Sequence, residues 1–464
     1  MANNSGGKFI LDSIYRGEQQ DKILANVSLL NERLREKCPG APLLLNLDKT
    51  HRNFIKSYHR PIIPIAYEAR RELAESGVVS YGTNVFSLPL YGDFMYEMVL
   101  SLELTGLSVV NPAERCGYYD FLGHRIIKRV WIEFSGQIID QYSGAAYDVF
   151  YNYFVPEDNK KSYLRGVGQE FPEEVVLEND GFRELKYVVW GPQSPKVSHD
   201  AVRLNIPIIF DFSTKLNASL FSAKIPYGMR YLKIELAQPA EFVYLNGVGG
   251  VNYPAITGDL WVNHVFIDPE VRDRLKLGTF KTLIRVFKET EFAAATLGVQ
   301  KLDAIRFPVE EIFFGLKPGG NNGPKTWNKY TDFENIPVTF PVAVPFGLPP
   351  FQLAFRTENF TKPRPSILVA NFLTRNTAVT NPQSFDYLNS SIFKSRSPHD
   401  SGLHCVTFRG KVSDDVTGYY NISTDREFFV NYTASVGGNF YIIARCINWI
   451  VIGENGSVQL AYPS

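Results

Sequence analysis

The chain has 464 residues, and its 48 basic and 48 acidic side chains give a formal net charge of zero at pH 7. A protein that neutralises many phosphates needs a basic excess or a basic arm, so this balance argues against direct nucleic-acid binding. Aromatic residues make up 14% of the chain, with 34 Phe and 25 Tyr against 4 Met, and 35 Gly and 28 Pro punctuate it throughout. This composition predicts an all-β chain, and the length predicts two to three domains.

Residues 1–50 differ from the rest and contain a predicted amphipathic helix at 21–37, with Asp21 as a plausible N-cap and Pro39-Gly40 as a stop. The apolar residues of that helix recur at spacings of one, three and four: Ile23, Leu24, Val27, Leu30 and Leu34. One interpretation is a helix that packs on its own domain. The alternative is an arm that docks on a neighbouring subunit or a membrane-proximal partner.

The N-terminus lacks the cationic start and apolar core of a signal peptide, and no run reaches the 18 apolar residues that a membrane span needs. The four cysteines, Cys38, Cys116, Cys405 and Cys446, form no CxxC spacing, so free and mostly buried thiols are favoured over disulfides. The sequence therefore predicts a protein made in the cytosol, where its N-glycosylation sequons stay unused.

The stretch Tyr81–Gly106 is predicted to form a strand, a tight turn at Leu90–Asp93 and a long second strand. The even positions of the second strand are apolar: Phe94, Tyr96, Met98, Leu100, Leu102 and Leu104. Period two places these residues on one face of a sheet and Glu97 and Glu103 on the other. Strand rise separates those two carboxylates by roughly 20 Å, which is too far for a catalytic dyad.

Further segments with strand patterns recur along the chain, with a short helix expected within each half. Strands are predicted at 59–69, 125–136, 204–212, 226–237, 260–268, 283–292, 302–316, 366–374, 403–412 and 419–423, a long strand pair at 439–462, and the helices at 141–155 and 384–392. The stretch 239–257 is the best linker candidate, because Gly247, Gly249 and Gly250 cluster before Pro254.

The two halves share one plan, which predicts an all-β fold of two tandem eight-stranded jelly-roll sandwiches with short inserted helices and an N-terminal helical arm. The expected domains are an arm at 1–50, a first jelly roll at 51–238, a linker at 239–257 and a second jelly roll at 258–464. The loop-like region 317–365 is too long for a plain connection, so it should be a functional insertion with its own order.

Motifs that carry chemistry are absent or weak. There is no GxxxxGK[ST], GxSxG or HExxH, and the GVGG at 247–250 is a turn, not a dinucleotide fingerprint. His399-Asp400 and His404-Cys405 have metal-ligand side chains, but their spacing matches no structural zinc site. Glu310 and Glu311 could suggest glycosidic chemistry, yet adjacent strand residues diverge unless a bulge turns one, so an exposed rim is expected. No catalytic, cofactor-binding or metal-binding residue is predicted, and the chain is not expected to be an enzyme.

Four segments, in order, resemble the double jelly-roll major capsid proteins of the large nucleocytoplasmic DNA viruses. They are YGTNVFSLPLYGDFMYEMVLSLELTG, LNIPIIFDFSTKLNASLFSAKIPYGMRYLKIELA, LWVNHVFIDPEVRDRL and SDDVTGYYNISTDREFF. The third resembles the strand that opens the family's second domain. Asp211-Phe212-Ser213 departs from the family's usual basic and aromatic residues, and this divergence suggests a marseillevirus-like or other amoeba-infecting giant virus.

The resemblance implies a structural subunit. Three chains would form a homotrimer with a pseudo-hexagonal outline, and these capsomers would tile an icosahedral shell over an inner membrane around double-stranded DNA. The implied partners are other copies of the chain, neighbouring capsomers and minor capsid proteins, with the arm near the membrane. The loop 317–365 would be an outer tower or a trimer clasp, and the protein would reside in the virion after assembly in the host cytoplasm.

The alternative function is a two-domain jelly-roll protein that binds carbohydrate, since jelly rolls also make lectins. The aromatic-rich segment Cys116-Gly117-Tyr118-Tyr119 could stack on sugar rings. The two functions are not exclusive, because a capsid tower can also touch host glycans.

Overall fold

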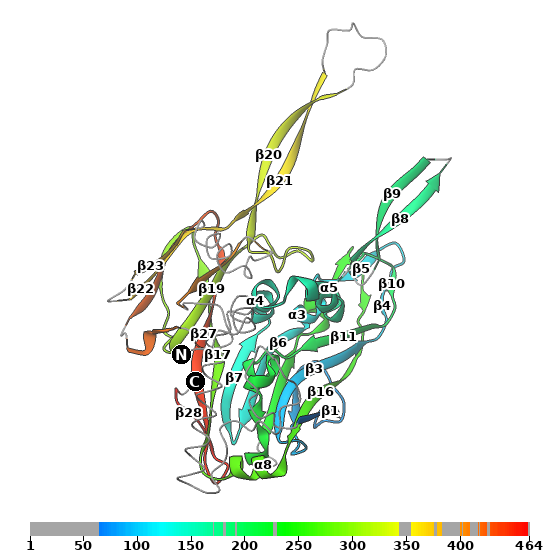
Figure 1. Cartoon of the computed structure of the whole chain (residues 1–464). Coiled ribbons are helices and arrows are strands. Elements are labelled where there is room, and N and C mark those ends of the chain that lie inside the picture. The colour runs from blue at the N-terminus through cyan, green and yellow to red at the C-terminus, as the bar shows by residue number, and fades with distance from the viewer. Residues whose placement is uncertain are drawn as a thin grey trace, which may run out of the picture. The chain divides into compact units, whose positions relative to one another are not determined.

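The computed structural model describes residues 65–169, 171–179, 182–190, 193–225, 230–342, 354–374, 378–382, 400, 402–408, 416, 418–424 and 427–462 (Figure 1). Internal contacts divide the chain into two units, Met1–Ala66 with Ile267–Val271 and Tyr67–Phe266 with Arg272–Ser464. The second unit, the main body, contains both β-domains. The arm 1–50 and the helices predicted at 21–37 and 384–392 lie outside the described residues. No described helix is long and apolar enough to cross a membrane.

The first β-domain has a five-stranded and a four-stranded antiparallel sheet. The larger one has the order β1-β16-β3-β11 with β12 on β3, and its strands are β1 (Ile65–Glu72), β16 (Ile256–Ile267), β3 (Phe94–Leu104), β11 (Val202–Pro207) and β12 (Leu220–Phe221). The smaller one has the order β2-β13-β6-β7, with β2 (Gly82–Ser87), β13 (Arg230–Leu236), β6 (Ile127–Phe134) and β7 (Gln137–Ser143).

Short sheets and helices complete the first half. The sheets are β10-β4-β15 (Ser198–His199, Leu107–Val109, Val251–Asn252), β14-β5 (Val243–Asn246, Arg115–Tyr118) and the hairpin β8-β9 (Phe171–Asn179, Phe182–Trp190). The helices are α3 (Leu122–Ile126), α4 (Ala145–Tyr153), α5 (Glu157–Gly166), α6 (Asp211–Thr214), η2 (Leu216–Ala218), η3 (Ser222–Lys224) and α7 (Pro239–Phe242).

The second β-domain repeats the plan of two antiparallel sheets. The larger sheet has the order β17-β27-β19-β24, with β25 on β19 and β28 on β27; its strands are β17 (Phe280–Ala294), β27 (Gly438–Ile452), β19 (Pro308–Pro318), β24 (Leu403–Thr407), β25 (Tyr420–Asn421) and β28 (Val458–Leu460). The smaller sheet is β18-β26-β22-β23 (Leu297–Lys301, Phe428–Ala434, Ile367–Thr374, Ala378–Pro382). The hairpin β20-β21 (Thr331–Val342, Ala354–Pro365), α8 (Pro269–Lys276) and η4 (Ile422–Thr424) complete it.

The core follows the period-two pattern of the sequence. On β13 every second residue is buried, while the residues between them are half-buried, including Lys233, whose ammonium pairs with Glu133 on the neighbouring β6 at 2.7 Å. The buried apolar residues of these two strands that line the core are Ile127, Val130, Ile132, Phe134, Leu232, Ile234 and Leu236. Burying each large apolar side chain contributes about 1.5–3 kcal/mol, so the alternation explains both the strands and their facing. The all-β prediction is confirmed.

The long strand at 94–104 forms as predicted, but its facing changes near its start. Leu100, Leu102 and Leu104 are buried and Glu103 is exposed, whereas Met95, an odd position, is fully buried. The register against β16 shifts here: Val262 pairs with Met98, and two residues later His264 pairs with Met95. Such a bulge places one extra residue on β3 and reverses the alternation beyond it.

The predicted hairpin at 81–106 is wrong, although both of its strands form. β2 and β3 belong to different sheets, and the connection between them crosses from one sheet to the other. At its start the Leu88 N–H donates to Arg230 O of β13, and at its end the Asp93 N–H donates to Val265 O of β16. β2 and β3 therefore lie in the two different sheets of this domain.

The boundary predicted between the two jelly rolls also needs correction. The strand expected to open the second domain at 260–268 is β16, which pairs with β3 from Ile256 opposite Leu104 to Val265 opposite Phe94. The main sheet of the first domain thus continues past residue 258. The predicted linker 239–257 is not plain chain either, because it contains α7, β14 and β15.

One further strand is shorter than predicted, and the long loop-like region 317–365 contains paired strands. The strand predicted at 204–212 ends at Pro207, and Asp211 begins the short helix α6. Within the long region 317–365, β20 and β21 pair over their full 12 residues as an antiparallel hairpin (Figure 1). The expectation that this region has its own order is met by that hairpin.

Candidate functional site: the seam between the two β-domains

Two edge strands of the main body, one from each β-domain, meet at β7 and β17. β7 closes the four-stranded sheet of the first domain, and β17 closes the larger sheet of the second. Edge strands expose unpaired N–H and C=O groups, which must find other partners when they are buried. We call the contact between these domains the seam.

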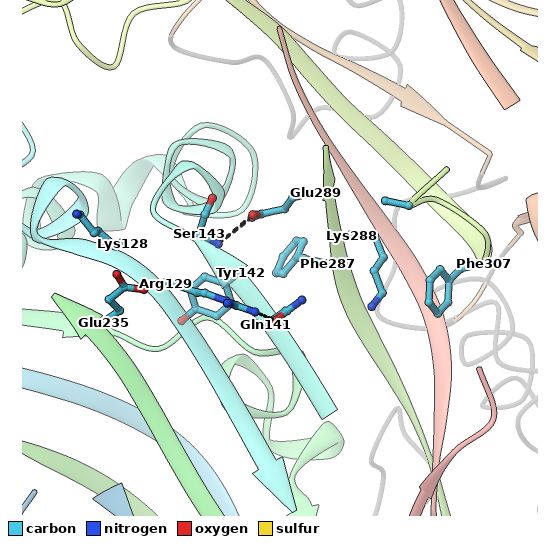
Figure 2. Close-up of a pocket in the computed structure, with 11 residues that line it drawn as sticks. Lys128, Arg129, Gln141, Tyr142, Ser143, Glu235, Phe287, Lys288, Glu289 and Phe307 are labelled. Carbon is cyan, nitrogen blue, oxygen red and sulfur yellow. Dashed lines mark hydrogen bonds between the residues drawn. The ribbon is translucent and has the colours of Figure 1, made fainter. Parts of the chain in front are cut away.

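Side-chain carboxylates take the place of a β-ladder at the seam. The Phe287 N–H on β17 donates to Asp140 Oδ1 on β7 at 3.3 Å. In the opposite direction, the Ser143 N–H on β7 donates to Glu289 on β17, at 3.1 Å from Oε1 and 3.0 Å from Oε2 (Figure 2). Each edge strand thus supplies a carboxylate that accepts a backbone N–H of the other strand. The two sheets are connected by these hydrogen bonds and remain separate sheets.

Burial changes the acidity of these groups. Desolvation raises the pKa of Asp140 well above its ordinary value, and it raises the pKa of Glu289 as well, although the N–H donors oppose both shifts. Burial lowers the pKa of Lys288, against the attraction of the Asp140 carboxylate. The charges at this part of the seam are therefore held against a desolvation cost.

A groove of about 600 Å³ runs along this contact (Figure 2). Two of its cationic side chains have polar partners within the protein: Lys128 pairs with Glu241 at 2.8 Å, and Arg129 donates to Gln141. The full lining is Lys128, Arg129, Gln141, Tyr142, Ser143, Glu235, Phe287, Lys288, Glu289, Ala304 and Phe307. The polar groups of this groove hold the domains together and do not form an arrangement of nucleophile and base.

A second part of the seam is a buried charge cluster formed by Asp211, Arg285, Glu310, Glu311 and Arg445. Arg285 Nε contacts Glu310 Oε2 at 2.7 Å, and Arg445 Nη1 lies 3.6 Å from Glu311 Oε2. Asp211, from the first domain, lies between the arginines, 3.2 Å from Arg445 Nη2 and 3.8 Å from Arg285 Nη1. One carboxylate of the first domain is thus clamped by two guanidinium groups of the second.

The exposed rim predicted for Glu310 and Glu311 is wrong, because both side chains are 0% exposed. The register of β19 against β27 shifts between Val309 and Glu311, and a bulge there lets adjacent side chains share one environment. Burial would lower the pKa of Arg285, but the hydrogen bond and charge of Glu310 raise it overall. These carboxylates are ion-paired to arginine, which excludes the free acid and base that hydrolysis of a glycoside requires.

Tyr330 makes a third contact across the seam, at the root of the β20-β21 hairpin. Its hydroxyl donates to Asp148 Oδ2 on α4 at 3.1 Å, and its N–H donates to Asp400 Oδ2 at 2.9 Å. Asp400 in turn donates its own N–H to Asn152 Oδ1 at 3.0 Å. The hairpin root is therefore fastened to a helix of the first domain.

The candidate metal-ligand segment at 399–405 has a structural role. His399 lies outside the described residues. Both oxygens of Asp400 accept backbone N–H groups, from Tyr330 and from Gly402. The His404 ring stacks on Phe314 at 5.3 Å, and Cys405 is buried. Among the described residues, no group of three or more His, Cys, Asp or Glu side chains could hold a metal ion.

Other singled-out residues are separated from the seam. Glu97 and Glu103 lie on the exposed face of β3, as predicted, and Glu97 accepts a hydrogen bond from Asn263 at 3.0 Å. In the GVGG turn, the Val248 and Gly249 N–H groups both donate to Glu114 Oε1.

The segment expected to bind sugar does not present free rings. Tyr118 is buried and stacks on Phe242, and Tyr119 packs edge-on against Tyr244. Cys116, Cys405 and Cys446 are free and buried, as predicted, while Cys38 lies outside the described residues.

Sequence reasoning missed Asp211, Arg285 and Arg445 as interacting residues. Arg285 and Arg445 occupy buried positions within the otherwise apolar runs LIRVF and IIARCI. A charge inside such a run is a signal of a buried partner, since unpaired buried charges are very costly. The sequence does not reveal that the partner belongs to the other domain.

Comparisons with known proteins agree with this architecture. A model of the family described as "Major capsid protein N-terminus" matches residues 54–268. Hexon protein p72 of African swine fever virus (isolate Tick/Malawi/Lil 20-1/1983) is 21% identical, over 99% of this chain and 100% of its own length. The hexon protein p72 of the strain Badajoz 1971 Vero-adapted is 20% identical with the same coverage.

Solved structures are similar over most of the chain. The Faustovirus major capsid protein has a TM-score of 0.70 at 20% identity, covering 95% of this chain and 99% of its own. The PBCV-1 virus capsid has a TM-score of 0.64 at 17% identity, covering 89% of this chain and 100% of its own. These similarities show the double jelly-roll fold, and the matching relatives are structural proteins. The chain is therefore similar over nearly its whole length to proteins named hexon protein or major capsid protein of large DNA viruses, and residues 54–268 match the family model of the major capsid protein N-terminus.

Proposed function

We propose that three copies of this chain form a homotrimeric capsomer with a pseudo-hexagonal outline, and that such capsomers tile the icosahedral shell of a large double-stranded DNA virus. Two sandwiches in each of three chains would supply the six similar walls of the outline (3 × 2 = 6). The names of the relatives, hexon protein and major capsid protein, support this proposal.

The seam is the observation that carries the proposal. A pseudo-hexagonal outline needs the two sandwiches of one chain to keep a fixed relation, because free rotation would prevent six walls from closing. Reciprocal capping by Asp140 and Glu289, the clamp on Asp211 and the hydrogen bond of Tyr330 to Asp148 join the two domains at three places. Such a chain can act as one building block with two similar halves.

Mass measurement of the full-length protein tests the proposal. One chain has a mass of 52.5 kDa, so a trimer should sediment at 3 × 52.5 = 157.5 kDa and keep that mass on dilution. A monomer at micromolar concentration would contradict the proposal. The variant Arg445→Met, which opens the clamp, should lower the trimer fraction, and the matched surface variant Arg306→Met should leave it unchanged because Arg306 is exposed.

We further propose that residues 1–50 lie on the inner side of the shell and contact minor capsid proteins or the inner membrane. The amphipathic pattern at 21–37 supports an arm with one apolar face. Assembly would take place in the host cytoplasm. Deleting residues 1–50 should preserve the trimer but abolish binding to vesicles or to minor proteins from purified virions. Unchanged binding of both kinds would contradict this placement.

The hairpin β20-β21 is proposed to be an outer tower or trimer clasp. It is a separate two-stranded sheet, and isolated hairpins are at best marginally stable in water. A contact with another copy would supply the missing support. Replacing residues 335–361 with a short turn separates the two roles: loss of the trimer indicates a clasp, and retention of the trimer with a flatter outer surface in images of particles indicates a tower.

A further inference from the structure

His264 is an unusual residue of the first β-domain. It lies on β16 where the register against β3 shifts, and its side chain is 0% exposed. Within the described part of the chain, neither Nδ1 nor Nε2 has a hydrogen-bond partner. Buried polar atoms are almost always paired, so an imidazole with two unpaired nitrogens calls for a physical reason.

The connection between β2 and β3 packs directly on this imidazole. The Tyr91 ring meets the His264 ring edge-on, with centroids 5.4 Å apart. A Cβ at Gly92 would lie only 2.6 Å from the His264 Cβ, so the backbone of the connection is in close contact with β16. The Asp93 N–H donates to Val265 O at 3.0 Å and completes the contact.

Two cations and two acidic groups lie on the elements around His264. Arg230 on β13 is fully buried, and the guanidinium of Arg70 on β1 lies 3.2 Å from the centre of the Tyr91 ring. The acidic groups of the neighbouring elements are Asp93 and Glu68. Glu68 accepts the Tyr91 hydroxyl at 2.7 Å and lies 3.7 Å from Arg70, so its charge is already engaged.

Only the neutral imidazole suits this environment. Burial, Arg230 and Arg70 together lower the pKa of His264 from its ordinary 6.5 to about 4, against a smaller opposing effect of Glu68. A protonated ring would place a third cation beside two guanidinium groups without a hydrogen-bond acceptor for either N–H. Movement of the connection 88–93, which packs on the ring, away from β16 would relieve this by opening the ring to water.

We infer that His264 makes this end of the first jelly roll sensitive to acid. Protonation of its imidazole releases the connection 88–93 from β16 and loosens the packing there. The pKa of His264 is lower in the folded state than in the unfolded state. The free energy of unfolding is therefore not reduced by this group above pH 6.5, and it decreases as the pH falls towards 4. The contribution of this one group raises the unfolding equilibrium constant about 30-fold between pH 7.5 and pH 5. The inference does not depend on the proposed trimer.

Unfolding of the full-length protein by urea at pH 7.5 and pH 5 tests this inference. The wild-type protein should lose more stability on acidification than His264→Leu, and the difference between the two should correspond to about 30-fold in the unfolding constant. Equal losses in wild type and His264→Leu would overturn the inference.

A milder variant covers the case in which His264→Leu fails to fold. Arg70 is about half exposed, so Arg70→Gln should fold, and removal of its charge should raise the pKa of His264 and shrink the acid-induced loss. The neighbouring Arg71→Gln is the matched control, because Arg71 pairs with Asp259 and has no part in the shift of His264. An acid-induced loss that is the same in Arg70→Gln as in the wild type would contradict the inference.

Discussion

The central strands of the two main sheets, β3 and β19, have the same length of 11 residues but very different surroundings. β3 is exposed at Glu97 and Glu103 on one face and buried on the other over Met98–Leu104. β19 is buried on both faces from Pro308 to Leu316, and this buried segment includes two glutamates.

A helix of the first domain accounts for much of this difference. Phe313 of β19 packs against Tyr153 of α4 and the following Phe154, with ring centroids 4.9 and 5.6 Å apart. The Tyr153 hydroxyl also donates to Leu403 O on β24, the strand next to β19. A strand covered on both faces has no solvent for its charges, so Glu310 and Glu311 must be paired inside the protein. Whether a glutamate on a strand is solvated or ion-paired therefore depends on whether a remote segment covers that strand.

The largest effect is expected from placing a charge on the buried face of β3. Leu100→Asp buries a carboxylate without a partner, which should cost at least about 5 kcal/mol and abolish the soluble trimer. Soluble yield and size-exclusion chromatography measure this. Glu97→Asp on the exposed face of the same strand is the control and should behave like the wild type. An unchanged trimer yield in Leu100→Asp would refute the facing assigned to β3.

Removal of Arg445, which pairs with Glu311 of the covered strand β19, should destabilise the protein, whereas removal of an exposed arginine should not. Arg445→Met leaves Asp211 and Glu311 without one of their guanidinium partners, and breaking such a buried pair should cost about 3–5 kcal/mol. Urea unfolding measures the loss of stability. Arg306→Met, on the surface, should change stability by less than about 1 kcal/mol. A comparable change in both variants would mean that the clamp does not stabilise the seam.

A smaller effect is expected at the hairpin root. Tyr330→Phe removes the hydroxyl that donates to Asp148 Oδ2 and should destabilise the protein by about 1–2 kcal/mol. Thermal unfolding checks this value. The exposed Tyr419 is a matched control, and Tyr419→Phe should leave the unfolding temperature unchanged. No effect of Tyr330→Phe would show that this contact does not hold the hairpin root to α4.

The smallest effect is expected at the reciprocal caps and depends on pH. Burial raises the pKa of Glu289 in the folded protein, so its contribution to stability is complete at acid pH and is lost as the pH rises through that raised value. Glu289→Gln keeps an acceptor for the Ser143 N–H without the charge. The variant should therefore be more stable than the wild type at pH 8 by up to about 1 kcal/mol and show no gain at pH 4.5. A gain of equal size at both pH values would contradict this assignment.

Much of the fold could be predicted because one face of most strands meets solvent. β3, β6 and β13 were recognised from alternating residues, and α4 was predicted from its helical spacing. The hairpin at 81–106 and the strand at 260–268 were misplaced, because short connections can lead either to the same sheet or across the core. Local pattern specifies that a strand forms, whereas its partner strand depends on contacts far along the chain.

The residues of the seam show the same difference between what the sequence predicts and what only the structure reveals. The sequence by itself determined two β-domains with apolar cores, an inserted helix and a protein without catalytic motifs, because these follow from residue type and short-range spacing. Only the tertiary structure decided that Asp211 of one domain lies between Arg285 and Arg445 of the other, and that Glu310 and Glu311 are buried. The physical reason is that a charge takes its role from the groups packed around it, and those groups come from segments that are remote in sequence.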